Sequence, residues 1–175
     1  MQVFWPEAHP SIVLGAVLVT YTFFHYWSHR LRHQVDFFWR TTHQMHHSPN
    51  RFDLSLSVYV HPFDVAFITL VIVGSTMLVA GFSPEYFGMV GLMHVLLDKP
   101  AHLNVKTPLW LGHFIYRPEQ HSLHHETHDN NYGLIPLWDK LFGTFKDCEH
   151  QAPKIGFANL RTSNFWDILL CKKVG

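Results

Sequence analysis

Three long apolar runs dominate the pattern of hydrophobic and polar positions and predict the principal helices. The first extends from Ser11 to Trp27, interrupted only by hydroxyl groups and His25, and the second, from Val65 to Phe82, carries no charge. The third extends from Tyr86 to Leu97. A helix needs about 20 apolar residues to cross a bilayer, so we predict membrane helices over these runs. Each run also fits a buried core helix of a soluble protein, and the third is short enough for a re-entrant segment.

Local signals mark where these elements begin. Ser11 follows Pro10 and is expected to start the first helix. Ser83 is the expected N-cap of the third helix, with Pro84 at its first position. The second and third runs therefore predict a helical hairpin that enters and leaves on one side. From Gly133 onwards we expect a helix-and-turn cap whose aromatic side chains serve core packing rather than substrate or partner contact. These side chains are Trp138, Phe142 and Phe145.

The charged residues orient the chain in a membrane. Basic residues follow the first and third runs, whereas the stretch before Ser11 carries only Glu7 and the turn before Tyr86 only Glu85. Because Lys and Arg accumulate in cytoplasmic loops, we expect the N-terminus and this turn outside and the histidine-rich segments in the cytoplasm. No cleavable signal peptide is expected, since Met1–Pro10 lacks a basic region. The basic residues are Arg30, Arg32, Arg40, Arg51, Lys99, Lys106 and Arg117.

Length and overall charge narrow the classes of function. The chain has 175 residues, which predicts one domain over residues 1–175. Lys plus Arg and Asp plus Glu both number 13, and no basic stripe is present, so no nucleic-acid partner is expected. Cys148 and Cys171 form no CxxC motif, and neither a disulfide framework nor a thiolate metal site is indicated.

The unusual feature of the composition is its 16 histidines, most of them clustered. Three histidines spaced by four residues, beginning at His25, project from one face of the first helix. The pattern HxxHH occurs at 43–47 and again at 121–125, and in a helix each copy presents its imidazoles along one turn. His102 lies between the two boxes. Buried imidazoles in such number are most simply explained by a cation. Without His25, two clusters of three, one of two and a further histidine give nine candidate donors, more than one ion can use. We therefore predict a site for two metal ions.

The remaining histidines have weaker signals. His25 and His128 fit either an additional ligand or a hydrogen-bonded packing residue, with packing favoured. His61, before Pro62, is expected to cap or orient the hairpin rather than to bind metal. Asp98, four residues before His102, fits equally an acceptor that orients the imidazole and a simple helix-end charge. The histidines expected to be ordinary surface or core residues are His9, His94, His113 and His150.

In order and spacing, these motifs resemble those of the fatty acid hydroxylase/sterol desaturase family over about residues 21–145. The chain departs from the family pattern at Thr22, near which relatives carry an acid, and at His25, where they carry an aromatic residue. It also begins late relative to members that have an additional N-terminal hairpin. The matching segments are Tyr26–His33, His43–Pro49, Val60–Pro62, His102–Val105, His121–His125, Asn131–Gly133 and Trp138–Thr144.

The resemblance implies an all-α, integral-membrane helical bundle of four helices under a cytosolic, histidine-rich helical cap. It implies two iron ions, O2 as co-substrate, and hydroxylation or desaturation of a lipid such as a fatty acyl chain or sterol. Because no GxGxxG fingerprint is present, electrons are expected from a separate donor, of ferredoxin or cytochrome b5 type with its reductase. The implied ligands are His29, His33, His43, His46, His47, His102, His121, His124 and His125, and possible additional ligands are His25, His61 and His128.

Two other functions fit the same residues. A zinc-dependent membrane hydrolase would use HxxHH to bind zinc and Glu119 or Glu126 as acid or base. A degenerate, non-catalytic protein that binds metal or lipid is the third possibility. The lipid, the oxidised carbon, the reductant and the oligomeric state do not follow from the sequence.

Overall fold

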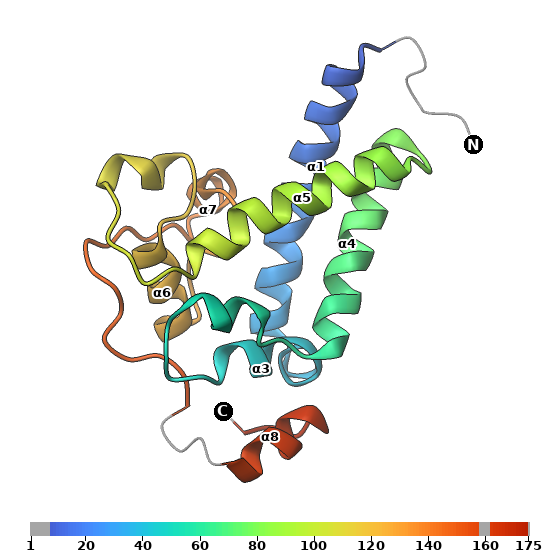
Figure 1. Cartoon of the computed structure of the whole chain (residues 1–175). Helices are drawn as coiled ribbons and strands as arrows, with labels where there is room; N and C mark the ends of the chain where they lie inside the picture. Colours follow the sequence, from blue (N-terminus) through green and yellow to red (C-terminus); the bar gives the residue numbers. More distant parts are fainter. Residues whose placement is uncertain (1–7, 158–161, 175) are drawn as a thin grey trace.

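The computed structural model describes residues 8–157 and 162–174, and all regular structure in these ranges is helical (Figure 1). This confirms the expected all-α class. Glu7, one of the charges on which the predicted membrane orientation rests, lies outside the described residues. The α-helices are α1 Pro10–Gln34, α2 Asp36–Phe38, α3 Gln44–His47, α4 Pro62–Ala80, α5 Pro84–Ala101, α6 Pro118–Thr127, α7 Pro136–Leu141 and α8 Thr162–Leu169. A π-helix, η1 Trp39–His43, and the 3₁₀-helices η2 Leu54–Val58 and η3 Leu109–His113 complete the set.

The two helix starts differ in detail from the prediction. Helix α1 begins at Pro10, and its N-cap is His9, whose Nδ1 accepts from the backbone N–H of Ser11. Ser11 is therefore inside the helix rather than its cap. Ser83 occupies the N-cap position of α5 with Pro84 behind it, as predicted. Its hydroxyl, however, donates to the carbonyl of Ala80 across 3.0 Å and makes no cap bond.

Helices α1 and α4 lie side by side, and α4 and α5 form the predicted hairpin, with α5 crossing obliquely over the pair (Figure 1). A small apolar core joins them where they meet. Val13, Val17 and Tyr21 of α1 are buried there against Ala80 and Val90. Helix α7 closes on the same helix further along, where the ring of Phe142 stacks on Tyr26 and that of Trp138 packs edge-on against Phe23. Of the cap predicted after Gly133, Trp138 and Phe142 thus pack against α1, as expected, while both rings stay half-buried.

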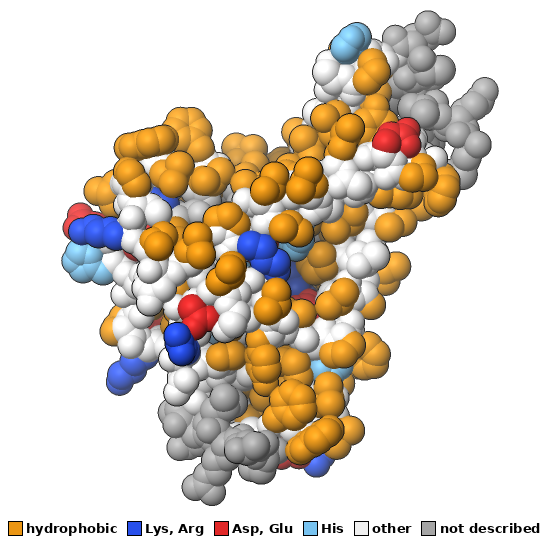
Figure 2. Space-filling model, in the orientation of Figure 1, with side chains coloured by type: hydrophobic (Ala, Val, Ile, Leu, Met, Phe, Trp, Pro, Cys, Tyr) orange, Lys and Arg blue, Asp and Glu red, His pale blue; other side chains and the backbone are white. Residues whose placement is uncertain are grey.

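Among the described helices, α1 and α4 are long and apolar enough to cross a membrane. A core helix of a soluble protein is mostly buried, but only 22% of the apolar window of α4 is buried here. Apolar side chains instead cover the outside of α4 and α5 (Figure 2). Helix α5 is not a candidate span, because its 18 residues include three charged ones, Glu85, Asp98 and Lys99. The two candidate spans therefore behave as expected of membrane helices, and α5 is an oblique partner to them.

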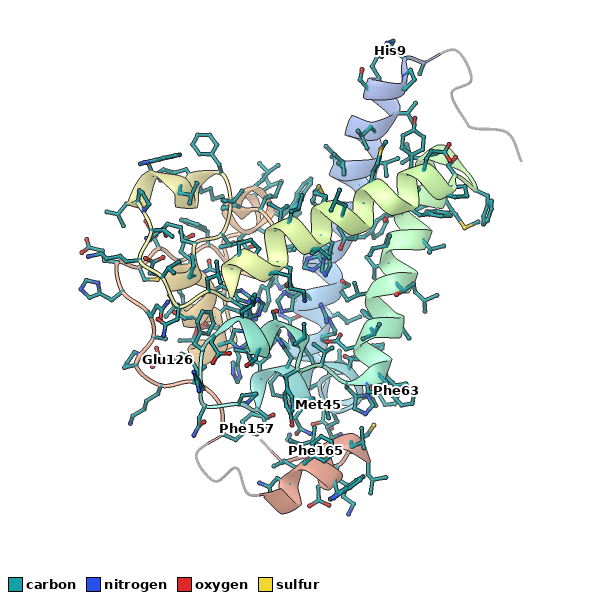
Figure 3. The ribbon with its side chains drawn as sticks, viewed as in Figure 1. His9, Met45, Phe63, Glu126, Phe157 and Phe165 are labelled. Carbon is teal, nitrogen blue, oxygen red and sulfur yellow. The ribbon has the colours of Figure 1, made fainter. Side chains whose placement is uncertain are left out.

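The long helices α1, α4 and α5 have different segments of the chain at their two ends. The start of α1 and the α4–α5 turn lie at one end, whereas α3 and α8 lie at the other (Figure 1). Helix α8 packs beneath α3, and Figure 3 shows Met45 of α3 above Phe165 of α8. The side chain of Gln44 fixes this contact, since it donates to the carbonyl of Lys172 and accepts from the N–H of Val174, each across 2.8 Å.

Candidate metal centre

The structure gathers the nine histidines of the predicted ligand set into two compact groups. Within each group, one potential ligand atom from every residue lies within 4.8 Å of the others. Neither group contains a carboxylate or a thiolate among the described residues. The five-histidine group is His29, His33, His43, His47 and His124. The four-histidine group is His46, His102, His121 and His125.

Each HxxHH box contributes to both groups. His43 and His47, four residues apart, belong to the five-histidine group, while His46 points to the other. The second box does the reverse, because His124 alone joins the five-histidine group. The two groups are adjacent, as the rings of His47 and His125 stack with centroids 4.2 Å apart. The boxes therefore interlock, and neither group is complete without both.

Local structure explains how the side chains reach these positions. His29 and His33 are one turn apart on α1, so they lie on one face of that helix. The first box begins in the π-helix η1 and continues in α3, with His43 at the junction. Single π-turns inside helices are frequent at functional sites. The second box lies entirely within α6, and His102 follows the last residue of α5.

Distances between ring nitrogens match those of shared metal ligands. Nε2 of His43 lies 2.9 Å from that of His29 and 3.1 Å from that of His47. Nε2 of His102 lies 2.9 Å from that of His121. Two nitrogens that bind one ion at about 2.1 Å and at a right angle to each other are about 3.0 Å apart. The spacing in both groups is therefore that of a coordination sphere.

Burial keeps these imidazoles neutral, the form that binds metal. Burial lowers the pKa of His46 and of His124 to about 3. It also holds the pKa values of His43, His47 and His125 well below 6.5, with neighbouring imidazoles and, for His43, Arg32 adding to the effect. The Nε2 atoms of His124 and His125 are buried without any hydrogen-bond partner in the described residues. Such orphaned polar atoms are costly, and a metal ion would satisfy them, so the residues present fit a pair of imidazole-bound ions.

Backbone carbonyls orient three of the rings. Nδ1 of His29 donates to the carbonyl of Tyr132, and Nδ1 of His124 to that of Asn130, each across 2.7 Å. Nδ1 of His102 donates to the carbonyl of Asp98 across 2.8 Å. In a neutral ring whose Nδ1 carries the hydrogen, Nε2 carries the lone pair, which leaves it free to bind metal. Asp98 does orient His102, but through its backbone, whereas its carboxylate pairs with Lys99.

Asp139 holds the loop that supplies two of these carbonyls. Its buried carboxylate accepts from the backbone N–H groups of Tyr132 and Gly133 across 2.8 and 2.7 Å, and from the hydroxyl of Thr144 across 2.7 Å. A Cβ at Gly133 would come within 2.5 Å of the Ile135 carbonyl, so this tight turn requires glycine. The sequence offered a signal here, because Asp139 lies in one of the segments shared with the family.

A buried ion pair lies beside the five-histidine group. Arg32 on α1 pairs with Asp64 on α4, and both side chains are almost inaccessible to solvent. The Nδ1 atom of His43 lies 3.4 Å from the second carboxylate oxygen of Asp64. Asp64 thus joins α4 to both α1 and a member of the group. The sequence analysis did not predict this pair. A usable signal was present, because Arg32 lies at the end of one largely apolar helix and Asp64 at the start of another.

The other candidate histidines lie outside both groups. His61 caps α4, since Nδ1 accepts from the N–H of Phe63 and Nε2 donates to the carbonyl of Leu169. This confirms its expected capping role. His128 packs against His33 and His47 but uses Nε2 to bond the carbonyl of His125. His25 packs against His29 with ring centroids 5.8 Å apart.

The four histidines expected to be surface or core residues all lie outside the groups. His113 and His150 are exposed, and His9 lies at the N-terminal end of α1, where it caps the helix (Figure 3). His94 is half-buried in the middle of α5, and its Nδ1 lies 2.8 Å from the hydroxyl of Tyr21.

The carboxylates considered for a zinc hydrolase are not in the groups. Glu119 is buried and accepts from the N–H and the hydroxyl of Thr107, both across 2.8 Å, while also pairing with Arg117. Those contacts make it a structural residue at the start of α6. Glu126 lies near the end of the same helix (Figure 3) and belongs to neither group.

A cavity of about 360 Å³ adjoins the groups between α1, α4 and α5. Its walls include His29 and His43 of the five-histidine group and His46 and His121 of the four-histidine group. Apolar side chains of α4 and α5 line the opposite part, among them Val65, Ile68, Ile72, Val95 and Leu97. A cavity of this size with mixed walls is suited to part of an apolar chain held beside the metal groups.

Comparison with known proteins places these features in context. The model of the fatty acid hydroxylase family matches residues 14–144. The chain is 32% identical to the alkylglycerol monooxygenase of Homo sapiens in an alignment of 146 positions that covers 78% of this chain and 31% of that protein. It is 30% identical to fatty acid hydroxylase domain-containing protein 2 of Homo sapiens, covering 79% of this chain and 41% of the relative. It is 32% identical to a very-long-chain aldehyde decarbonylase of Oryza sativa subsp. indica, covering 70% of this chain and 22% of the relative.

The chain thus spans about a third of the length of the alkylglycerol monooxygenases it matches. No solved structure matches it significantly.

Proposed function

The chain belongs to the fatty acid hydroxylase family, and from this membership we propose that it is an oxygen-dependent, iron-containing oxidoreductase that acts on a lipid. The observation that carries the proposal is the pair of interlocked histidine groups beside a cavity that apolar side chains of α4 and α5 partly line. Two of these relatives, a monooxygenase of alkylglycerols and a decarbonylase of very-long-chain aldehydes, support a lipid substrate.

We propose that the two groups hold two iron ions, one in each. Nine imidazoles, all but that of His33 buried, form an unusual donor set without a carboxylate, and imidazole suits iron as well as zinc. Two irons, when bound, would supply the redox chemistry with O2 that breaking an unactivated lipid C–H bond requires and no side chain provides. The ligands in this proposal are the five- and four-histidine groups, with His25, His61 and His128 left outside.

The chain's own residues prepare the site for that chemistry. The carbonyls of Tyr132, Asn130 and Asp98 fix the tautomers of three rings and so aim their lone pairs into the groups. Apolar side chains of α4 and α5 in the cavity wall would displace water around a bound lipid chain, which would limit side reactions. The walls also hold the substrate chain against the groups, so that one carbon is presented.

We further propose that the histidine groups face the cytoplasm. The start of α1 and the α4–α5 turn lie at one end of the molecule, as the charge pattern requires (Figure 1). Arg32 lies in the last turn of α1, and Arg40 and Arg51 follow that helix in the chain, at its end on the side of the groups. Electrons would then arrive from a separate cytoplasmic donor, of ferredoxin or cytochrome b5 type.

The zinc hydrolase is the second candidate function, and the geometry favours it less. Catalytic zinc is commonly held by three protein ligands with an acid or base nearby, whereas here each group has four or more imidazoles and no carboxylate. Glu119, the best candidate for the acid or base of a hydrolase, instead accepts hydrogen bonds from Thr107 and pairs with Arg117.

Comparison of lipid extracts by mass spectrometry tests the proposed function. Cells that express the chain should contain an oxidised lipid that is absent from cells carrying His102→Ala or His124→Ala, because each variant removes a ligand from one group. His113→Ala and His150→Ala change exposed residues outside the groups and should leave the product unchanged. Full product formation by His124→Ala would refute the ligand assignment.

A further inference from the structure

The first HxxHH box lies on a helix too short to hold its own orientation. Helix α3 has four residues, Gln44–His47, and follows directly on the π-helix η1. Helices of this length gain too few hydrogen bonds to offset the cost of their first turn, so tertiary contacts must stabilise them. The orientation of α3 matters for the proposed metal centre, because His46 belongs to the four-histidine group and His47 to the five-histidine group. The contacts that hold α3 therefore determine how the box is divided.

The C-terminal segment, residues 164–174, supports α3 from beneath. It comprises most of α8 and the residues after it, and α8 packs against α3 (Figure 1). Ile168 of α8 is 1% exposed, and Met45 of α3 is 4% exposed. The family model ends at residue 144, so this support comes from outside the matched region. The segment thus packs on the ligand box although it carries no proposed ligand itself.

Gln44 joins α3 to this segment with both ends of its amide. The side chain is completely buried, its Nε2 donates to the carbonyl of Lys172, and its Oε1 accepts from the N–H of Val174, each across 2.8 Å. Successive residues of a helix are about 100° apart, so Gln44 projects about 200° away from His46. The segment therefore holds the face of α3 that lies opposite this proposed ligand.

The segment is itself anchored to neighbouring elements. His61, the N-cap of α4, donates from Nε2 to the carbonyl of Leu169 across 3.1 Å. Earlier in the chain, the N–H of Phe157 donates to the carbonyl of Ser48, the residue that follows α3, across 3.2 Å. A segment fixed to the start of a long helix is a firm support, because movement of α3 away from it would break both bonds of Gln44.

We propose that Gln44 is a positioning residue of the metal centre, through which docking of the C-terminal segment on α3 and binding of metal by the histidine groups stabilise each other. The inference rests on the proposed metal centre. The ions need the imidazoles of the first box to converge with those of α1 and α6, and the docked segment holds α3 in the orientation that allows this. Linkage is reciprocal, so the factor by which docking raises metal affinity is also the factor by which bound metal favours docking.

Zinc binding measures the coupling without turnover. The metal-free full chain in detergent is titrated with zinc in competition with a chelating dye, because zinc binds imidazole and has no redox chemistry. Val174→Pro removes the N–H that donates to Gln44, at a position beyond the end of α8. It should weaken zinc binding about fivefold, the effect of one hydrogen bond. Gln44→Leu removes both bonds and should weaken zinc binding about tenfold or more.

Matched variants separate the hydrogen bonds from the side chains. Val174→Ala keeps the N–H and should keep the zinc affinity of the wild type. So should Lys173→Ala, since this lysine is exposed and its ion pair with Asp36 lies at the surface. Hydrogen exchange of the backbone amides in residues 164–174 gives the reciprocal measurement. Zinc should slow this exchange in the wild type and slow it less in Gln44→Leu.

Unchanged zinc affinity in both Val174→Pro and Gln44→Leu would overturn the proposal, whether or not the exchange of residues 164–174 becomes faster. An equal loss of affinity in Val174→Ala and Val174→Pro would do the same, since only the proline removes the N–H. If Gln44→Leu does not fold, the two variants of Val174 still decide. The proposed function fails separately. A wild type that binds neither zinc nor ferrous iron refutes the metal centre itself, whereas equal zinc affinity across all variants refutes the coupling alone.

Discussion

The Nδ1 atom of His29 donates to the carbonyl of Tyr132 across 2.7 Å, and this bond couples a membrane-length helix to a loop about a hundred residues later in the chain. A carbonyl can only accept, so the hydrogen of the neutral His29 ring is on Nδ1 and the lone pair is on Nε2. That Nε2 faces His43 across 2.9 Å. The loop therefore sets the tautomer of a proposed ligand before any metal arrives.

Substitution of Asp139 should loosen the proposed metal centre without touching a ligand. In Asp139→Ala, the N–H groups of Tyr132 and Gly133 lose their acceptor, and the carbonyls that orient His29 and His124 lose their support. Loss of such an outer partner typically lowers metal affinity 10- to 100-fold. Titration of the metal-free protein with ferrous iron measures the affinity.

Asp36→Ala is the matched control, because Asp36 is exposed and its ion pairs among the described residues are with Arg40 and Lys173. Equal iron affinity in the Asp139 variant and the wild type would show that the loop does not support the site.

The stability of single and double variants should show the effect of the buried ion pair between Arg32 and Asp64. Asp64→Leu leaves the guanidinium of Arg32 buried without its partner, a change that typically costs about 3–5 kcal/mol of stability. Adding Arg32→Met removes the stranded charge and should restore part of that loss. The unfolding midpoint in detergent is the measurement, and a double variant no more stable than Asp64→Leu would refute this account.

Acid should destabilise the metal-free protein in a defined direction. Burial lowers the pKa of His46 and of His124 to about 3, against 6.5 for an ordinary histidine. As the pH falls below about 6.5, these histidines become protonated in the unfolded chain but stay neutral in the folded chain. Their contribution to the free energy of unfolding is therefore complete above that pH and is lost as the pH falls toward 3. Each such histidine contributes a slope of up to about 1.4 kcal/mol per pH unit.

Thermal unfolding of the metal-free protein at pH 7.5, 6.5 and 5.5 measures this effect. The midpoint should fall most between the last two values. A midpoint that rises on acidification would mean that the buried histidines are charged in the fold.

The orientation in the membrane is testable by cysteine labelling at exposed positions. Ser83 and Ser48 mark the two sides but are both buried, so Glu85 and Arg51 are better targets. With Cys148 and Cys171 replaced by serine, Glu85→Cys should react with an impermeant thiol reagent in intact cells. Arg51→Cys should react only after permeabilisation. The reverse pattern would place the histidine groups outside.

The main helices and the nine clustered histidines were predictable because their signals are local. The length of an apolar run such as Val65 to Phe82 can be read directly from the sequence, and α4 occupies nearly that range. The division of each HxxHH box between two groups was not predictable. It depends on how α3 and α6 face each other, which places His46 and His124 in opposite groups although they hold the same position in the motif.

The supporting residues were missed because their roles arise only from tertiary contacts. Asp64 reaches Arg32 across 32 residues of chain, and the carbonyl of Tyr132 has no sequence signature at all. His94 had no neighbouring histidine in the sequence, yet the fold brings it beside His25. Local pattern thus identified the proposed ligands, while the partners that orient them required the fold.

Metal reconstitution in lipid tests whether the histidine groups hold two irons that oxidise a lipid. Zinc binds more tightly than ferrous iron to a given set of ligands, so zinc in protein isolated from rich medium would decide nothing. Metal-free chain is therefore loaded with ferrous iron or with zinc, supplied with a reductant, and followed for O2 uptake and an oxidised lipid product. The account predicts about two irons per chain and reductant-dependent O2 uptake with iron alone, because zinc has no redox chemistry. Lipid turnover with zinc, or without O2, would contradict it and favour the hydrolase.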